Sequence, residues 1–293
     1  MLNRRTFLKT SGLLLAGTAV GGQLLTSCAS TPKVTKTIGL QLYSLRGDVK
    51  DRGIAETIKS VAEMGYKTVE AAGYSEGKFY GMAPAEFKAL VEANGLKCTS
   101  SHVGKGYDPE KLPEIMEWWN QCIAAHNELG VKYVVMPSPP IKLQDATEEQ
   151  LIAMRDYLED VGVNFNTVGI RFGYHNHKTE FHPFGDATVM DWLLTNSDPT
   201  RFTMELDVYW IAQAGLDPVA FIDKWADRIE LLHIKDEKEI GASGQIDFKA
   251  IFDKAYEKGK MQAFFIEQEA YSFPELESVK KSFDYINQAE YVK

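Results

Sequence analysis

Short runs rich in β-branched and aromatic residues recur along this chain at intervals of about thirty residues, and this period limits the possible folds more than any other feature. Eight such runs begin near Ile38, Thr68, Cys98, Lys132, Arg171, Phe202, Ile229 and Ala263. A helical pattern of apolar residues lies in each interval. Eight strands that alternate with helices predict either an open, doubly wound sheet or a closed (β/α)₈ barrel.

The helical pattern is clearest after the fourth run. Apolar residues recur there at steps of three and four, at Leu151, Met154, Leu158, Val161, Phe165 and Val168. These steps place one face of a predicted helix on the core. Thr147 and Gln150 form a capping-box pattern at its start. The pairs Asp108-Pro109 and Asp217-Pro218 are also typical of helix starts, because an N-cap acid precedes a first-turn proline.

The length of the repeating region favours the closed barrel over the open sheet. Eight regular units in about 250 residues suit a (β/α)₈ TIM barrel. No glycine-rich turn follows the first strand, where Ile38-Gly39-Leu40-Gln41-Leu42-Tyr43 continues directly into Ser44, so a dinucleotide site is not expected. Since no linker or compositional break marks a second domain, residues 37–293 are predicted to form a single barrel domain.

The first 27 residues are predicted to be an export signal and not part of the fold. Paired arginines at positions 4 and 5 precede a weakly hydrophobic stretch over residues 13–25, the pattern of a twin-arginine signal. This stretch is too short and too rich in glycine for a secure transmembrane anchor. Leu25-Thr26-Ser27-Cys28 resembles a bacterial lipobox, which implies cleavage before Cys28 and lipidation of that residue. Residues 28–36 then form a tether, and we expect a periplasmic, membrane-tethered lipoprotein.

The charge of the chain counts against nucleic acid as a partner. It has 32 basic and 41 acidic residues, a net charge of −9, and loss of the three basic residues in 1–27 lowers this to −12. An acidic surface repels phosphate backbones. The three cysteines provide neither a disulfide framework nor a zinc-binding spacing. The expected partner is a small molecule, and membrane contact is expected only through the lipid at Cys28.

Polar residues gather where the predicted strands end, which is the face of a barrel that carries the chemistry. They are Gln41, Tyr43, Glu70, His102, His175, His177, Glu180, Asp207, Trp210, His233, Lys235 and Glu267. For His102 alone, a structural hydrogen-bonding role is the alternative to a functional one. For Glu70 alone, the alternative is a helix cap. Asp207, His233 and Glu267 each follow an apolar strand, and such groups pointing into one mouth need a cation between them. Mixed oxygen and nitrogen ligands suit manganese, zinc, iron or cobalt.

Five motifs together resemble the xylose-isomerase-like TIM barrels, known as sugar phosphate isomerases/epimerases. The motifs are Gln-Leu-Tyr-Ser-Leu-Arg at 41–46, Tyr-His-Asn-His at 174–177, Leu-Asp-Val-Tyr-Trp at 206–210, His-Ile-Lys-Asp at 233–236 and Ile-Glu-Gln-Glu at 266–269. The resemblance covers roughly residues 37–290. Together with the export signal, it resembles lipoproteins that are abundant in gut Bacteroidetes.

The resemblance implies one divalent metal ion, held by Glu, Asp, His and Glu at the ends of strands five to eight. Asp207, His233 and Glu267 match the last three ligands, whereas His175 stands at the first position. A similar replacement occurs in the inosose-dehydratase-like branch, and Glu180 is the other candidate for this ligand. Family epimerases use the two glutamates on opposite faces of the substrate, so the replacement counts against a symmetric two-glutamate epimerisation.

The implied activity is that of a metal-dependent isomerase or epimerase that removes a proton beside the carbonyl group of a keto sugar. Glu267, His177 or His102 is expected to move the proton, and Lys235 to neutralise the developing oxyanion. Residues expected to contact the carbohydrate are Gln41, Tyr43, Glu70, Trp210 and Glu180, with Tyr43 and Trp210 stacking on the sugar. Packing at the top of the barrel is the alternative role for Trp210.

Two other functions remain open at this point. The first is a lyase or hydratase that acts on 3-keto-glycosides or related oxidised sugars by elimination or hydration. The second is a periplasmic sugar-binding barrel without turnover, which would need no metal. A nuclease of the endonuclease IV type would need more metal ligands and a basic groove, and the negative charge counts against it.

Overall fold

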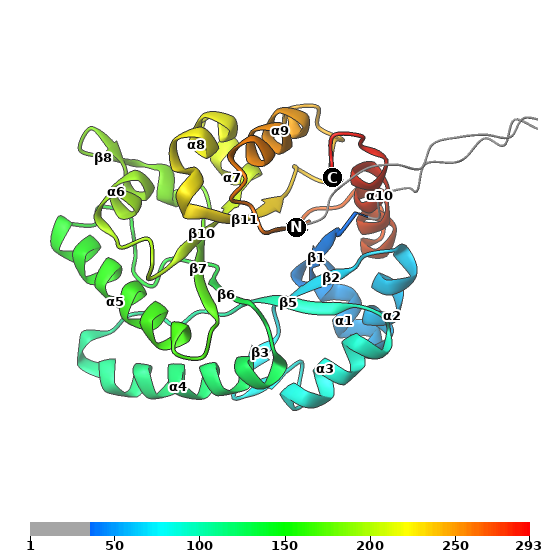
Figure 1. Ribbon diagram of the computed structural model, residues 1–293, viewed down its shortest axis with the longest axis horizontal. Helices are drawn as coiled ribbons and strands as arrows, with labels where there is room; N and C mark the ends of the chain where they lie inside the picture. Colours follow the sequence, from blue (N-terminus) through cyan, green and yellow to red (C-terminus); the bar gives the residue numbers. More distant parts are fainter. Residues whose placement is uncertain (1–35) are drawn as a thin grey trace, which may run out of the picture. The chain divides into compact units, whose positions relative to one another are not determined.

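The computed structural model describes residues 36–293, which form a closed barrel of eight parallel strands. The strands follow one another around the barrel in chain order (Figure 1). Their bounds are β1 Gly39–Gln41, β2 Thr68–Ala71, β5 Lys97–His102, β6 Tyr133–Met136, β7 Arg171–His175, β10 Thr203–Asp207, β11 Ile229–Ile234 and β12 Ala263–Ile266. Every predicted strand start lies within one residue of an observed one, and the predicted (β/α)₈ barrel is confirmed. The predicted signal over 1–27, Cys28 and the tether up to residue 35 lie outside the described residues.

Helices surround the barrel and fill the connections between its strands (Figure 1). Their bounds are α1 Arg46–Arg52, α2 Ile54–Met64, α3 Pro84–Ala93, α4 Leu112–Leu129, α5 Glu148–Asn166, α6 Val189–Asn196, α7 Val208–Gln213, α8 Pro218–Trp225, α9 Phe248–Lys258 and α10 Glu275–Gln288. Two small hairpins lie beyond β2 and β7, and they are β3 Tyr74–Ser75 with β4 Lys78–Phe79, and β8 Pro183–Phe184 with β9 Ala187–Thr188. Within residues 36–293, no helix has the length and apolar character that crossing a membrane requires.

The helix starts follow the predicted capping chemistry. At the start of α5, the Thr147 hydroxyl accepts from the Gln150 backbone N–H at 3.4 Å, and the Gln150 side chain accepts from Thr147 N–H at 2.9 Å. Asp217 caps α8 by accepting from Val219 N–H at 2.8 Å. The predicted apolar face of α5 is buried as far as Phe165. Val168 is an exception with 37% exposure, because the helix ends at Asn166 before another turn can carry it inward.

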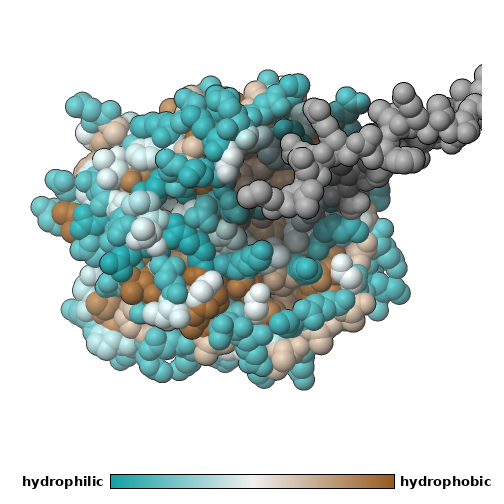
Figure 2. Space-filling model, viewed as in Figure 1, coloured by the Kyte–Doolittle hydropathy of each residue, from teal (hydrophilic) through white to brown (hydrophobic). Residues whose placement is uncertain are grey.

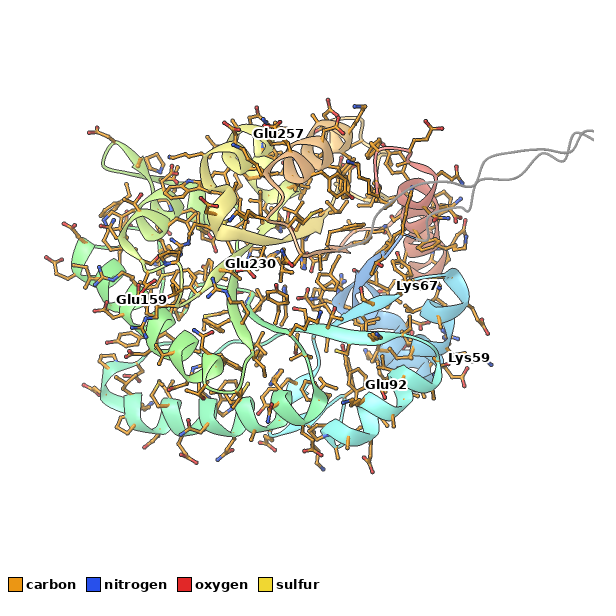
Figure 3. The ribbon with its side chains drawn as sticks, viewed as in Figure 1. Lys59, Lys67, Glu92, Glu159, Glu230 and Glu257 are labelled. Atoms are coloured by element: carbon orange, nitrogen blue, oxygen red, sulfur yellow. The ribbon has the colours of Figure 1, made fainter. Side chains whose placement is uncertain are left out.

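The core has two parts, one between the barrel and its helices and one inside the barrel. The helices turn their apolar faces to the strands, so their outer faces carry charged residues such as Lys59 on α2 and Glu257 on α9 (Figure 3). Figure 2 shows hydrophilic residues over most of one face of the molecule. Inside the barrel, Val135, Leu231 and Phe265 form an apolar layer.

This inner layer sets the level at which the polar residues begin. Alternate residues of a strand point to the same face, so the positions two residues after Leu231 and Phe265 also point inward. Those positions are His233 and Glu267, toward the carboxyl ends of β11 and β12. An apolar plug therefore closes the lower barrel, and ionisable groups fill the barrel above it.

Candidate functional site

The four residues predicted to hold a metal ion come together at the carboxyl mouth of the barrel. One potential ligand atom from each of His175, Asp207, His233 and Glu267 lies within 4.8 Å of the others. His175 Nε2 is 3.5 Å from Asp207 Oδ2, and His233 Nδ1 is 3.2 Å from Glu267 Oε2. All four residues are buried. They lie within one residue of the carboxyl ends of the neighbouring strands β7, β10, β11 and β12.

Several polar atoms of this group have no hydrogen-bond partner among the described residues and could bind a cation instead. Both ring nitrogens of His175 and the Oδ2 atom of Asp207 are buried and lack a hydrogen-bond partner within residues 36–293. Unpaired buried polar atoms are costly, and a cation that accepts their lone pairs would remove the cost. Burial raises the pKa of Asp207 and lowers that of His175 well below its usual value, so the imidazole is neutral and can donate a lone pair. The residues present therefore fit a divalent metal ion.

Asp207 also has a structural role at this position. Its Oδ1 atom accepts hydrogen bonds from the backbone N–H groups of Tyr209 and Trp210, both at 2.9 Å, and thereby caps α7. The Oδ2 atom faces the other three residues of the group and has no hydrogen-bond partner among the described residues. The cap fixes the carboxylate in one orientation, so the two oxygens serve different purposes.

Lys235 lies beside the same carboxylates and is almost completely buried. Its Nζ atom is 3.0 Å from Glu267 Oε2 and 3.9 Å from Asp207 Oδ2, and it also pairs with Glu269. Burial alone would lower the pKa of Lys235, but these carboxylates outweigh it and raise the pKa. The ammonium group therefore stays charged, balances part of the negative charge and holds the carboxylates in place.

A second group of ionisable residues lies against the first and shares His233 with it. It contains Glu70, His102, Glu205 and His233, and its potential ligand atoms also lie within 4.8 Å of one another. His233 Nε2 is 2.7 Å from Glu70 Oε2, and His102 Nε2 is 2.6 Å from Glu205 Oε2. Burial would raise the pKa of Glu70, but His102 and His233 lower it to about 2. Burial and the Glu70 charge raise the pKa of Glu205 instead.

Glu70 fixes the orientation of His233. The carboxylate accepts from the Gln41 side-chain amide at 2.7 Å and from the Ser100 hydroxyl at 2.5 Å, so it cannot turn freely. With Nε2 of His233 bound to Glu70, Nδ1 points to Glu267 and the upper group. A carboxylate that orients the second ring nitrogen in this way is the usual companion of a metal-binding histidine.

Glu205 was not predicted as a site residue, although the sequence contained a signal for it. It precedes Asp207 by two residues on β10, so both side chains point into the barrel. It is buried, and its Oε1 atom has no hydrogen-bond partner in the part of the chain that the structure describes. The alternation of the strand, applied backward from Asp207, would have identified it.

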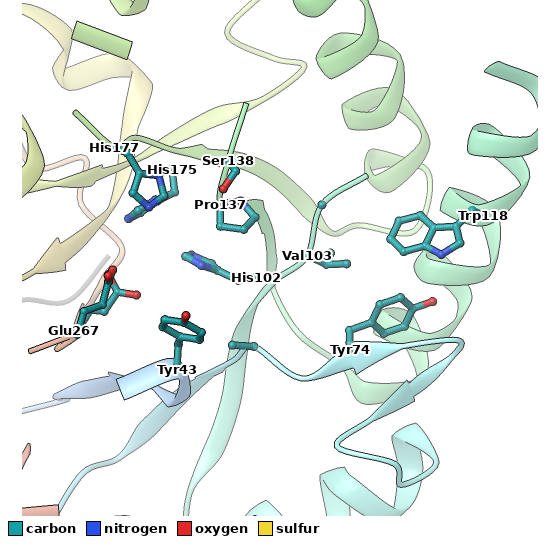
Figure 4. A pocket seen from close by; sticks show the side chains of 13 residues that line it. Tyr43, Tyr74, His102, Val103, Trp118, Pro137, Ser138, His175, His177 and Glu267 are labelled. Carbon is teal, nitrogen blue, oxygen red and sulfur yellow. The ribbon is translucent and has the colours of Figure 1, made fainter. Parts of the chain in front are cut away.

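An open cavity of about 440 Å³ adjoins the two groups (Figure 4). Its lining contains five predicted site residues, Tyr43, His102, His175, His177 and Glu267, together with Glu269. Tyr43 is 45% exposed, and the Arg46 guanidinium lies 4.6 Å from the centre of its ring. The lining carboxylates come from the end of β12, whereas the histidines come from β5 and β7. Acidic and imidazole groups therefore face the same space from different sides.

Three residues predicted to contact substrate are buried away from this lining. Gln41 and Glu70 bind each other below it. Glu180, the other candidate for the fourth metal ligand, accepts from the Tyr174 hydroxyl at 2.8 Å and from His177 N–H at 3.0 Å. Glu180 therefore holds the loop after β7 in place, and His175 takes the position in the ligand group. None of these three residues has an exposed surface in this structure, and their predicted contacts with substrate stay predictions.

Trp210 and Lys235 also lie outside the cavity lining. The Trp210 ring packs 5.7 Å from the ring of His177 and 4.9 Å from Lys235 Nζ. Trp210 therefore packs against residues of the site in this structure, and the sugar stacking predicted for it stays a prediction. Lys235 is 2% exposed, so it acts on the site through the carboxylates beside it.

The fold and the site together define a (β/α)₈ barrel with a histidine–carboxylate centre at its carboxyl mouth. Residues 58–289 match the model of one family, described as "Xylose isomerase-like TIM barrel". The chain belongs to this family.

The most similar relatives include enzymes of more than one kind. The inosose dehydratase of Geobacillus kaustophilus is 23% identical over 212 residues, which are 66% of this chain and 67% of the relative. That of Lacticaseibacillus casei is 24% identical over 247 residues, 72% of this chain and 80% of the relative. A sugar phosphate isomerase/epimerase from Parabacteroides distasonis has 33% identity and a TM-score of 0.82, covering 88% of this chain and 100% of the other. The 3-keto-D-glucoside 4-epimerase of E. coli has 16% identity and a TM-score of 0.67, with 87% and 100% covered, and supports the fold.

Proposed function

We propose that this protein is a metal-dependent enzyme that removes a proton beside the carbonyl group of a keto sugar, as an isomerase or epimerase does. The observation that carries the proposal is the buried group of His175, Asp207, His233 and Glu267, with its unpaired nitrogen and oxygen atoms at the edge of an open cavity. A site that only binds neutral sugar has no need of such a group, because its burial is costly without a cation.

These four residues would hold the metal, and their two imidazoles and two carboxylates suit manganese, zinc, cobalt or iron. When bound, a divalent metal polarises a carbonyl oxygen and stabilises the negative charge that develops on it. The protein prepares the ligands beforehand, because Glu70 orients His233 and the α7 backbone orients Asp207. Lys235 offsets part of the repulsion between Glu267 and Asp207.

Two groups at the cavity can move the proton. Burial tends to raise the pKa of Glu267, but Lys235 and His233 hold it well below its usual range, so the carboxylate is ionised. Its place at the cavity lining is what suits it to accept a proton from the substrate. His177 lines the same cavity from the end of β7 and can return a proton to the substrate. His102 is hydrogen-bonded to Glu205 at 2.6 Å, so its ring is held in a fixed position at the lining.

Elimination is the second candidate reaction, and the placement of these groups favours it. The cavity has a carboxylate on the β12 side and imidazoles on the β7 side, so a base and a proton donor of different kinds face the substrate. Such a pair suits removal of one proton and protonation of a leaving oxygen. The named activity of the inosose dehydratases, to which this chain is 23–24% identical, is also of this type. We propose 3-keto-glycosides and related oxidised sugars as substrates for this reaction.

The test uses the purified protein with manganese, zinc, cobalt or iron, and a panel of keto sugars and 3-keto-glycosides in deuterated water. Proton NMR should show metal-dependent exchange or loss of the proton beside the carbonyl. An inverted or rearranged sugar identifies epimerisation or isomerisation, and a released substituent or an enone identifies elimination. Exchange that persists fully after chelation would refute the metal requirement. Sugar binding without exchange, in metal-loaded protein, would instead support the non-catalytic alternative.

A further inference from the structure

The cavity is larger than the reaction at its polar end requires. At about 440 Å³ it falls in the range of pockets that take drug-sized ligands. Figure 4 shows His175, His177 and Glu267 at one end, and Tyr74 and Trp118 at the other, with His102 and Val103 between them. The space therefore continues from the candidate metal ligands to a second region with different chemistry.

This second region, which we call the apolar arm, is formed by Tyr74 and Trp118 at its end, and Val103 and Pro137 line the way into it (Figure 4). Tyr74 contributes its ring and not its hydroxyl group, which points away from His102 in Figure 4. The hydroxyl group lies beside the Cys122 thiol and the Gly77 backbone, and partial burial and the Cys122 thiol raise its pKa to about 12. The arm therefore offers a ligand mainly hydrocarbon surface and few hydrogen-bonding groups.

The arm is held open by contacts behind it. The Tyr74 ring lies 4.9 Å from the ring of His126, 5.4 Å from that of Phe79 and 5.8 Å from that of Trp118, at 81° to the last. Trp118 packs edge-on against Trp119 at 5.0 Å. The ammonium group of Lys105 lies 5.2 Å from the Trp118 ring. Because these aromatic side chains are already ordered, binding a flat ring between them costs little side-chain conformational entropy.

The chemistry of the arm discriminates between possible occupants. A second sugar would bury several hydroxyl groups there, and hydroxyls buried without partners are costly. An aromatic ring has no such groups, and it can pack against the rings of Tyr74 and Trp118 in stacked or edge-to-face geometry. We infer that the apolar arm binds an aromatic substituent attached to the sugar, so that the substrate is an aryl glycoside with its sugar at the metal ligands. This inference rests on the proposed function for the placement of the sugar.

Binding can be measured without turnover, with phenyl and methyl glucosides of both anomeric forms as probes. These compounds have no keto group, so calorimetric titration reports affinity alone. Of the two phenyl glucoside anomers, the one that binds the unmodified protein more tightly should have at least about tenfold higher affinity than the methyl glucoside of the same anomeric form. The reason is that only the phenyl ring gains apolar burial. In Trp118→Ala and in Val103→Ser the advantage should fall below about threefold, while affinity for the methyl glucoside stays within about twofold.

Trp192→Ala is the matched control. Trp192 is also a half-buried tryptophan, but it lies on α6 against Phe184 and outside the cavity lining. Its replacement should leave the phenyl advantage intact. Equal affinity for the phenyl and methyl glucosides, no phenyl glucoside binding, or a phenyl advantage that survives both Trp118→Ala and Val103→Ser would overturn the inference. Proton exchange on keto sugars without any phenyl advantage would refute the arm alone, whereas phenyl binding without exchange would refute the proposed function alone.

Discussion

The two oxygens of Asp207 perform separate tasks, and one substitution can separate them. Oδ1 caps α7, whereas Oδ2 faces the candidate metal ligands without a hydrogen-bond partner among the described residues. Asparagine caps helices about as well as aspartate. Asp207→Asn can therefore keep the cap while it replaces the charged ligand oxygen. We expect the metal-free variant to unfold within about 2 °C of the unmodified protein, because its cap is retained.

The effect of metal on stability should differ strongly between the two proteins. A ligand present at 100 times its Kd stabilises the folded state by about 2.7 kcal/mol. For a domain of this size, each kcal/mol raises Tm by about 2–4 °C, so the unmodified protein should gain about 5–10 °C. Replacing a residue that only hydrogen-bonds to a metal ligand weakens metal binding about 10–100-fold. Replacing a charged ligand itself should therefore weaken metal binding at least about 100-fold. At the same metal concentration the variant then gains only about 0.4 kcal/mol, or about 1 °C.

Thermal unfolding followed by circular dichroism, with and without added manganese or zinc, measures both quantities, and elemental analysis gives the metal bound. Asp217→Asn is the matched control, since Asp217 caps α8 in the same way but belongs to neither ionisable group. It should keep the full metal-induced shift. A shift in Asp207→Asn equal to that of the unmodified protein would refute the assignment of Oδ2 as a metal ligand.

Three further predictions concern other parts of the chain. We propose export and lipid tethering at Cys28, so that Cys28→Ala should release the exported protein from the membrane fraction; retention of both forms in the cytoplasm with residues 1–27 intact would contradict this. Burial lowers the pKa of His126 from 6.5 to about 4, so between pH 6.5 and pH 4 the unfolded state binds more protons than the folded state. Lowering the pH over that range should therefore reduce the free energy of unfolding by about 3 kcal/mol. His126→Gln should flatten this dependence in urea unfolding, and an unchanged slope would count against it. Thr147→Ala removes half of the α5 capping box and should lower the free energy of unfolding by about 1 kcal/mol; no change in urea midpoint would show that the cap is dispensable.

The architecture could be predicted from the sequence, because the signals involved are local and repeated. Each strand and each helix carries its own pattern, and eight regular units leave few ways to close a sheet. The same reasoning located Asp207, His233 and Glu267, since in a parallel barrel every strand ends at the same mouth, whereas His175 was added through the family resemblance. That rule requires no knowledge of which strands are neighbours.

The roles of the polar side chains at that mouth were decided only by the tertiary structure. Gln41 and Glu70 lie at strand ends like the other candidates, yet their side chains form a hydrogen bond with each other. Glu70 is also hydrogen-bonded to His233 on β11. Which side chains meet across the barrel depends on strand tilt and stagger, which no single strand encodes. The depth of a residue, and hence its access to substrate, depends on the same quantities.

The apolar arm illustrates the same limit for the cavity. Trp118 lies on α4, and Tyr74 lies in a hairpin after β2, more than forty residues earlier in the chain. No local pattern in the sequence connects these two residues. Packing of α4 beside that hairpin brings their rings to 5.8 Å and makes a wall of the cavity. Local patterns specify which elements form, whereas the space between elements exists only once they are packed together.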